Sequence, residues 1–242
     1  MIKHIEILNK ENLVLRGYLH LPQNANRILV MFHGYTGNKT EHNGSFRKMS
    51  RILEQMGIAS LRMDYACNGE SDGEFIDFRF DKAIDDAKIM LDYAFSIEGI
   101  KEVDVLGFSM GGAIASLVCN YKPISKLLLW SPAGDLAKNM RIRYDNSPKL
   151  ENGNIYSPAF EYSEELVKSM EKFDFYSEAQ YFKSKVYLIH GRKDKAVDYL
   201  CSVRYAVKFP NASLHLIDGA GHGYDEKNSF EELFAKSISF LK

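Results

Sequence analysis

The segment with the most specific chemical pattern is 107–111, which reads Gly-Phe-Ser-Met-Gly and lies between an apolar run and a helix-like stretch. A Gly-x-Ser-x-Gly sequence between a strand and a helix is typical of the nucleophile elbow. The turn is so tight that side chains two residues before and after the serine would collide with it, which explains both glycines. We therefore expect Ser109 to project above a sheet, at the positive end of a helix, as a nucleophile.

A serine hydroxyl is a good nucleophile only when a base removes its proton and a third group orients that base. In the elbow arrangement the acid and the histidine follow the serine in that order, each after a later strand. The apolar run 186–189 leads to Asp194, and the run 214–217 leads to His222. The sequence therefore predicts a triad of Ser109, Asp194 and His222 on loops at one edge of the sheet.

Two further aspartates compete with Asp194 for the role of the acid. Asp218 is only four residues before His222, too close for the usual arrangement on separate loops. Asp225 follows the histidine and so reverses the usual order. A turn-forming role between its two neighbouring lysines is the structural alternative for Asp194. The triad order favours Asp194 as the acid.

An acyl-transfer site also needs N–H donors for the developing oxyanion, each worth about 3 kcal/mol. One donor is the backbone N–H of the residue after the nucleophile, which is Met110. The second is expected from the loop after the strand 28–32, which reads His-Gly-Tyr-Thr-Gly over residues 33–37. We assign it to the N–H of Tyr35. We expect His33 to orient this loop by hydrogen bonding rather than to act as a second base.

Short apolar runs, separated by helix-like segments, must position these residues. After an opening hairpin (2–8 and 14–21), the strand candidates are 28–32, 58–62, 103–106, 127–130, 186–189 and 214–217. Runs this apolar suit a parallel sheet that is covered on both faces. Apolar stripes at helical spacing occur between several of them and at the C-terminus. The alternation predicts an α/β protein with a mostly parallel, twisted, doubly wound sheet and helices on both faces.

The segment 131–185 interrupts this alternation, because it follows the sixth strand with many aromatic residues and no clear strand. A connection of that length inside a compact domain is usually an active-site cover. We therefore predict one domain, residues 1–242, in which 131–185 is an inserted lid with a helix over 163–170. A packed helical excursion that only covers the core is the alternative.

Composition excludes several other classes of protein. With 31 basic and 32 acidic residues, the chain has no global basic field for nucleic acid or an anionic membrane. Scattered histidines and the lack of a phosphate loop or dinucleotide fingerprint predict neither a metal nor a cofactor. Three well-separated cysteines and no signal-peptide pattern favour a cytoplasmic location. We expect a small-molecule substrate and no nucleic-acid or membrane partner, and a homodimer is compatible with the sequence.

The chain order of the predicted triad resembles that of the α/β-hydrolase superfamily, over essentially the whole chain. Within it, the segments 33–41, 69–73 and 130–134 are similar to bacterial cinnamoyl (feruloyl) esterases. The resemblance implies the α/β-hydrolase fold, with the lid inserted after the sixth strand, and a serine carboxylesterase without a cofactor. It also implies that the positions matching Tyr35 and Met110 form the oxyanion hole, in agreement with the assignment above.

These observations together predict a serine carboxylesterase that hydrolyses small carboxylic esters through an acyl-serine intermediate. The resemblance adds hydroxycinnamoyl (feruloyl-type) esters as candidate substrates. An amidase, peptidase or thioesterase would use the same triad and is the first alternative. A hydrolase fold that binds a ligand without turnover is the second, and the intact triad argues against it.

Overall fold

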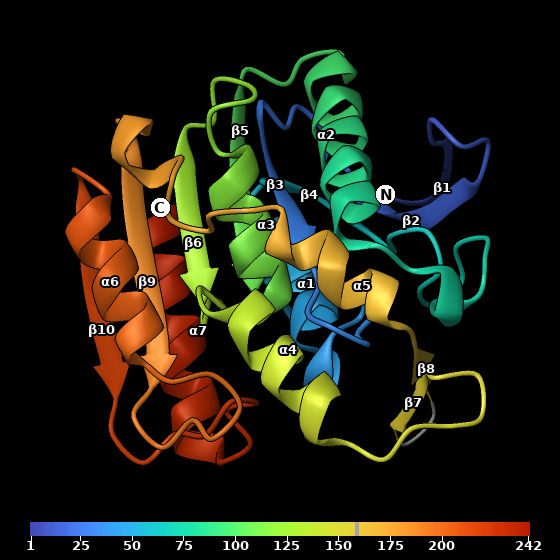
Figure 1. Ribbon diagram of the computed structural model, residues 1–242. Helices are drawn as coiled ribbons and strands as arrows, with labels where there is room; N and C mark the ends of the chain where they lie inside the picture. The colour runs from blue at the N-terminus through green and yellow to red at the C-terminus, as the bar shows by residue number, and fades with distance from the viewer. Residues whose placement is uncertain (158–159) are drawn as a thin grey trace.

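The computed structural model describes residues 1–157 and 160–242, in which eight strands form one sheet with helices on both sides (Figure 1). In spatial order the strands are β1 (Ile2–Leu8), β2 (Val14–His20), β4 (Ala59–Met63), β3 (Arg27–Phe32), β5 (Glu102–Phe108), β6 (Lys126–Trp130), β9 (Lys185–Gly191) and β10 (Ala212–Ile217). The pairs β1–β2 and β2–β4 are antiparallel, and the other pairings in this sheet are parallel. The predicted opening hairpin, the six later strands and the mostly parallel sheet are confirmed.

Strand side chains alternate between two hydrophobic cores, because successive residues of a strand point to opposite faces of the sheet. In β3, Ile28, Val30 and Phe32 belong to one core, and Leu29 and Met31 belong to the other. Burial of each large apolar side chain contributes roughly 1.5–3 kcal/mol of stability. A strand with both faces covered is therefore mostly apolar, as β3 is, although buried polar residues such as Ser60 and Arg62 of β4 interrupt some of the runs.

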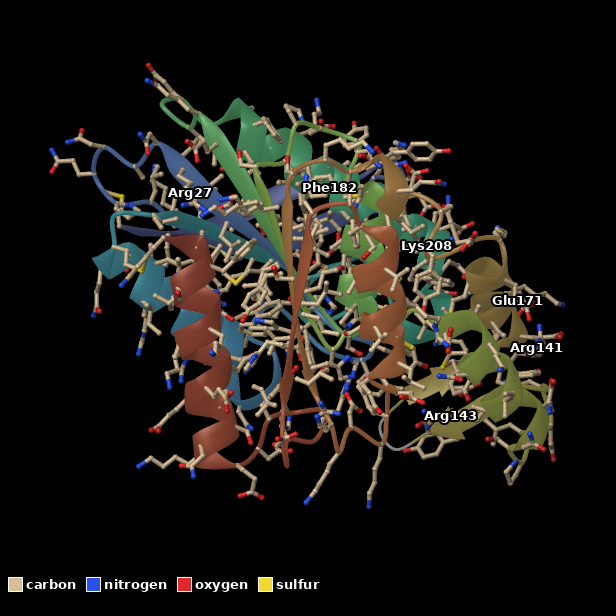
Figure 2. The ribbon with its side chains drawn as sticks, turned by 90° about the vertical axis from the view of Figure 1, so that its left-hand side faces the viewer. Arg27, Arg141, Arg143, Glu171, Phe182 and Lys208 are labelled. Carbon is tan, nitrogen blue, oxygen red and sulfur yellow. The ribbon has the colours of Figure 1, made fainter. Side chains whose placement is uncertain are left out.

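Helices cover both faces of the sheet, as predicted. On one face lie α1 (Ser45–Gln55) and α7 (Lys227–Leu241), and on the other lie α2 (Phe80–Ser96), α3 (Met110–Val118) and α6 (Leu200–Lys208). Figure 2 views the sheet from its edge, with α7 on one side and α6 on the other. In α1 the buried residues recur at helical spacing, and Gly57, with a φ of 74°, follows its end. No helix in the described part of the chain is long and apolar enough to cross a membrane.

The inserted segment between β6 and β9 has more regular structure than the sequence predicts. It contains α4 (Leu136–Asn146), the antiparallel pair β7 (Ile155–Ser157) and β8 (Phe160–Tyr162), and α5 (Glu164–Glu171). The predicted helix over 163–170 is confirmed as α5, and two short strands occur where the sequence shows no clear one. Strands of three residues are too short for an alternating pattern to stand out. Residues 158 and 159 of the predicted lid lie outside the described residues.

The aromatic residues of the inserted segment divide between core and surface. Four of them are buried in the core to which α2 and α3 contribute: Tyr144, Tyr162, Phe175 and Phe182. Tyr156 and Tyr181 are largely exposed. Phe175 packs on Phe80 of α2, Phe182 packs on Phe209 after α6, and Tyr144 packs on Tyr162 within the segment. Core packing therefore accounts for those four rings without reference to a substrate.

An ion-pair network holds α4 against α5. Two nitrogens of Arg141, Nε and Nη2, donate to the Glu171 carboxylate at 2.8 and 3.0 Å. A third, Nη1, donates to Glu164 at 2.9 Å. Figure 2 shows Arg141 beside Glu171 at the outer side of these two helices. The bidentate geometry fixes the relative orientation of the helices.

Candidate active site

Ser109 lies in the tight turn between β5 and α3. Its φ of 55° and ψ of −117° are unfavourable for a residue with a side chain. The turn is held in part by the Ser109 N–H, which donates to the Trp130 carbonyl at 2.9 Å. A Cβ at Gly107 would collide with the backbone of Gly111, and one at Gly111 would collide with the backbone of Phe32. A collision within the elbow, as predicted, thus explains Gly107, whereas the close approach of the elbow to the end of β3 explains Gly111.

His222 follows β10 and lies between Ser109 and Asp194. Its Nε2 is 3.0 Å from the Ser109 Oγ, and its Nδ1 is 2.6 Å from the Asp194 Oδ2. The ring packs on Phe108, with centroids 5.0 Å apart. A carboxylate only accepts hydrogen bonds, so Nδ1 carries a proton and Nε2 is left to accept from the serine hydroxyl. The structure thus brings the three predicted residues together in one chain of hydrogen bonds.

Asp194 follows β9, and its side chain is fully buried. Its Oδ1 accepts from the N–H groups of Ala196 and Val197, both at 2.8 Å, and its Oδ2 is also 3.1 Å from His190 Nε2. Burial by itself raises the pKa of Asp194, but the hydrogen bonds from His190 and His222 outweigh it and hold that pKa well below its usual range. Asp194 is therefore an ionised carboxylate that can orient a base and stabilise its protonated form.

Both competing aspartates pair with other residues. Asp218 has a side chain that is 89% exposed, and it lies 2.8 Å from the Arg192 Nε. Asp225 lies 2.6 Å from the His42 Nε2. Of the three aspartates, Asp194 is the one that contacts the predicted base.

The loop after β3 is held in place by His33, which is fully buried. Its Nε2 accepts from the Tyr65 N–H at 3.3 Å, and its Nδ1 donates to the Gly34 carbonyl at 2.9 Å. The Gly34 N–H in turn donates to the Glu41 carboxylate at 2.7 Å. These bonds fix the course of the loop. His33 therefore orients it, as predicted.

The backbone N–H groups of Tyr35 and Met110, predicted as oxyanion donors, have no hydrogen-bond partner within residues 1–157 and 160–242. Met110 begins α3, so its N–H is at the positive end of the helix. The Tyr35 loop touches the elbow, since a Cβ on Gly34 would lie 3.3 Å from the Ser109 Cβ. Both groups can donate to an oxygen atom bound near the serine.

An open cavity of about 460 Å³ lies over Ser109 and His222. Residues 34–38, Glu41 and Asp225 are among the residues that line it. Its described lining includes these two carboxylates and neither lysine nor arginine. A cavity of this size is typical of a site for a small molecule.

Residues that the sequence analysis did not assign to a metal or phosphate site have structural roles or no partner of that kind in the described ranges. No group of three or more His, Cys, Asp or Glu side chains in the described ranges could hold a metal ion. The three cysteines are buried and unpaired. In the segment 69–73, Asp72 accepts from the Val14 N–H at 3.0 Å and from Arg16 at 2.6 Å. That segment therefore shapes the loop after β4 and ties it to β2.

Sequence reasoning missed His190 and Glu41, which hold other site residues in place. His190 bonds to Asp194, and Glu41 bonds to the loop of the predicted oxyanion donor. The signal that could have found His190 is a His-Gly pair at the end of a predicted strand. The same pair occurs at His33 and Gly34, at the end of β3.

Comparison with known proteins gives a family and a fold. The family model described as serine aminopeptidase, S33 matches residues 23–152, which is more than half of the chain. No curated protein is similar enough in sequence to match.

Solved structures match over nearly the full length. Est1E from Butyrivibrio proteoclasticus, with ferulic acid bound, has a TM-score of 0.83 and 22% identity, covering 97% of this chain and 99% of that one. Mouse alpha/beta hydrolase domain-containing protein 10 has a TM-score of 0.81 and 19% identity, covering 99% and 98%. An esterase of Pyrococcus furiosus has a TM-score of 0.75 and 23% identity, covering 100% and 90%. These likenesses confirm the predicted α/β-hydrolase fold. The chain belongs to the serine aminopeptidase S33 family of α/β hydrolases, and it is a hydrolase.

Proposed function

We propose that the chain is a serine carboxylesterase that hydrolyses small carboxylic esters through an acyl-serine intermediate. The observation that carries this proposal is the unbroken line of hydrogen bonds from Ser109 through His222 to the ionised Asp194, beneath a cavity of small-molecule size. In this proposal Ser109 is the nucleophile, His222 the base and Asp194 the acid. The N–H groups of Tyr35 and Met110 form the oxyanion hole.

Acylation begins when the Ser109 Oγ attacks the ester carbonyl carbon while the His222 Nε2, 3.0 Å away, removes its proton. The carbonyl oxygen becomes an oxyanion, to which the Tyr35 and Met110 N–H groups donate. Asp194 stabilises the imidazolium that forms. The imidazolium then gives its proton to the departing alkoxide, so that an alcohol leaves and the acyl-serine remains.

Deacylation repeats the same steps with water as the nucleophile. His222 takes a proton from the water as it attacks the acyl carbon, and the oxyanion again accepts from the two N–H groups. When the intermediate collapses, His222 returns a proton to the Ser109 Oγ and the carboxylic acid is released. The acid ionises at neutral pH, and the carboxylates of Glu41 and Asp225 in the cavity lining disfavour rebinding of that anion.

Hydroxycinnamoyl esters are the substrates we propose to test first. Support comes from the likeness to Est1E, which was solved with ferulic acid bound. The Phe108 ring beside His222 also offers an aromatic surface within the cavity lining. The lack of lysine and arginine in the described lining suits an uncharged ester rather than an anionic one.

The test is a comparison of kcat/KM for methyl ferulate, a short aliphatic ester and a long-chain ester, with the purified protein and its Ser109→Ala variant. We expect methyl ferulate to be the best substrate and Ser109→Ala to lose turnover of all three. Equal rates on the three esters would remove the aromatic preference and leave the esterase proposal. Near-normal turnover by Ser109→Ala would contradict the mechanism.

The description of the family model favours a second candidate, an aminopeptidase or amidase that uses the same triad. Amides have poorer leaving groups than esters, so the two activities separate in rate. Matched ester, thioester and anilide substrates with one acyl group distinguish them, and faster turnover of the anilide would replace the esterase proposal. A folded protein that turned over none of these, and whose Ser109 did not react with a serine-directed phosphonate, would favour the other alternative, a binding protein with a hydrolase fold.

We further propose that the inserted segment 131–185 is a lid within one domain, residues 1–242. Phe160 of β8 packs on Phe75 with centroids 4.7 Å apart, and Phe75 packs on Tyr35 at 5.5 Å. These rings link the segment to the loop that supplies the proposed oxyanion donor. A cytoplasmic location is also a proposal, and the unpaired cysteines suit that reducing compartment.

A further inference from the structure

Asp194 receives hydrogen bonds from four donors, and orienting His222 explains only one of them. The N–H groups of Ala196 and Val197 donate to Oδ1. Two imidazoles meet at Oδ2, with His222 Nδ1 at 2.6 Å and His190 Nε2 at 3.1 Å. The second imidazole is the feature that the proposed reaction does not use.

The surroundings of His190 determine which of its nitrogens carries a proton. Nε2 lies 3.1 Å from the Asp194 Oδ2 and 3.0 Å from the Val197 carbonyl oxygen. Both of these oxygens only accept hydrogen bonds, so Nε2 must be the donor. Nδ1 lies 2.7 Å from the Ser202 Oγ, whose hydroxyl can donate to it. The ring is thus held at both ends, as a donor toward Asp194.

Burial and position exclude direct participation of His190 in chemistry. His190 and Ser202 are both fully buried, the first at the end of β9 and the second in α6. The cavity over Ser109 does not include either residue among its described lining. An effect of His190 on the reaction must therefore act through Asp194.

We propose that His190, held by Ser202, is a positioning residue that keeps the Asp194 Oδ2 aimed at His222. The proposal rests on the proposed function, because it assigns a purpose to the orientation of the proposed acid. The two backbone donors fix Oδ1 alone. A carboxylate anchored at one oxygen can still tilt, and the His190 donor at Oδ2 removes that freedom. Small displacements of catalytic groups lower the rate strongly, up to about a hundredfold for 1 Å.

Two amide substitutions of different reach test whether the donor to Asp194 is what matters. In His190→Gln the amide nitrogen reaches about as far as Nε2 and can still donate to Asp194. In His190→Asn the amide is shorter, keeps a polar group toward Ser202 and loses the donor to Asp194. We expect His190→Asn to lose about tenfold or more in kcat with little change in KM. We expect His190→Gln to recover most of that loss.

A readout without turnover accompanies the kinetics. We expect the proton between His222 Nδ1 and Asp194, which lie 2.6 Å apart, to give a strongly downfield proton NMR signal. We expect the signal to persist in His190→Gln and to shift or broaden in His190→Asn. Ser202→Ala, which removes the hydroxyl facing Nδ1, should give a smaller change in the same direction. The control is His215→Gln, because His215 lies on β10 outside the site and pairs with Glu232. This substitution should leave the signal unchanged.

Wild-type kcat and an unchanged signal in a folded His190→Asn protein would overturn the proposal. Equal losses in His190→Asn and His190→Gln would also overturn it, because the donor would then not be the cause. Thermal unfolding of each variant shows whether a loss of kcat comes from misfolding. If His190→Asn does not fold, Ser202→Ala supplies the test instead. If the protein hydrolyses no ester, the proposed function fails, and the NMR signal still decides whether His190 positions Asp194.

Discussion

Asp194 and His222 are held in very different ways, and the difference matches their proposed roles. Asp194 is buried and receives donors on both oxygens, so it is fixed and ionised. The His222 side chain is 25% exposed at the cavity and rests on one aromatic ring. A base that takes and returns protons needs access to substrate, whereas the group that orients it needs rigidity. The contrast supports the assignment of Asp194 rather than its exposed competitors.

The first prediction, at the residue scale, concerns Asp194→Asn. An amide can present an N–H to the His222 Nδ1, which would favour the tautomer that cannot accept from Ser109. Loss of the orienting carboxylate in a serine triad lowers kcat by about 10⁴-fold. We expect a loss of that order in kcat for the best ester, with a smaller change in KM.

The matched control for that variant is Asp218→Asn, on the exposed carboxylate that pairs with Arg192. It should keep activity within about twofold, since exposed ion pairs contribute little. Comparable losses in the two variants would show that the acid has been assigned wrongly.

At the scale of elements, the strands, the inserted segment with α5 and the proposed triad could be predicted from the sequence, but α4, the pair β7–β8 and most of the supporting contacts could not. The apolar runs are forced by a sheet with two covered faces, and Ser109, Asp194 and His222 then follow from chain order. In contrast, α4 went unrecognised because Leu136, Met140 and Tyr144 are its only buried residues, a stripe one residue wide. Contacts such as that of His190 with Ser202 join different elements, so no local pattern reveals them.

The second prediction tests how α7 covers its face of the sheet. Leu233 on α7 is 1% exposed and belongs to the core with Trp130 and Leu29. Leu233→Ala should lower the free energy of unfolding by about 2–5 kcal/mol, through lost burial and a residual cavity. Urea unfolding followed by circular dichroism measures this.

Leu200→Ala on α6 is the control for the same change in side chain, because Leu200 is 44% exposed. Its expected effect is within about 0.5 kcal/mol. If the two variants were equally stable, α7 would not pack on the sheet as described.

At the scale of the whole molecule, a parallel sheet gathers distant segments at one edge. Ser109 follows β5, Asp194 follows β9 and His222 follows β10, and in each case the loop leaves the carboxyl end of its strand. Loops from several strands can therefore contribute to one site while the sheet beneath them stays rigid. The buried charges that this packing creates also make the stability of the molecule depend on pH.

The third prediction concerns Asp86 on α2, a buried carboxylate that accepts from the Asn9 side chain and the Ala66 N–H. Burial raises its pKa from 3.8 to about 6 despite these two hydrogen bonds. The folded state therefore favours the protonated form. As the pH rises from 4 to 7, the contribution of Asp86 to the free energy of unfolding should fall, on the order of 3 kcal/mol in all.

Unfolding at several pH values compares wild type with Asp86→Asn, which cannot ionise. We expect the stability of wild type relative to the variant to decrease steadily as the pH rises. A pH-independent difference between the two proteins would contradict the raised pKa.

The central claim is that Ser109 is a nucleophile activated by His222 and Asp194. The most direct measurement is the reaction of the folded protein with a serine-directed fluorophosphonate, with the labelled residue located by peptide mass spectrometry. The account predicts one label per chain, on Ser109, and much slower labelling in Asp194→Asn. No label on the folded protein, or a label on a residue other than Ser109, would contradict it.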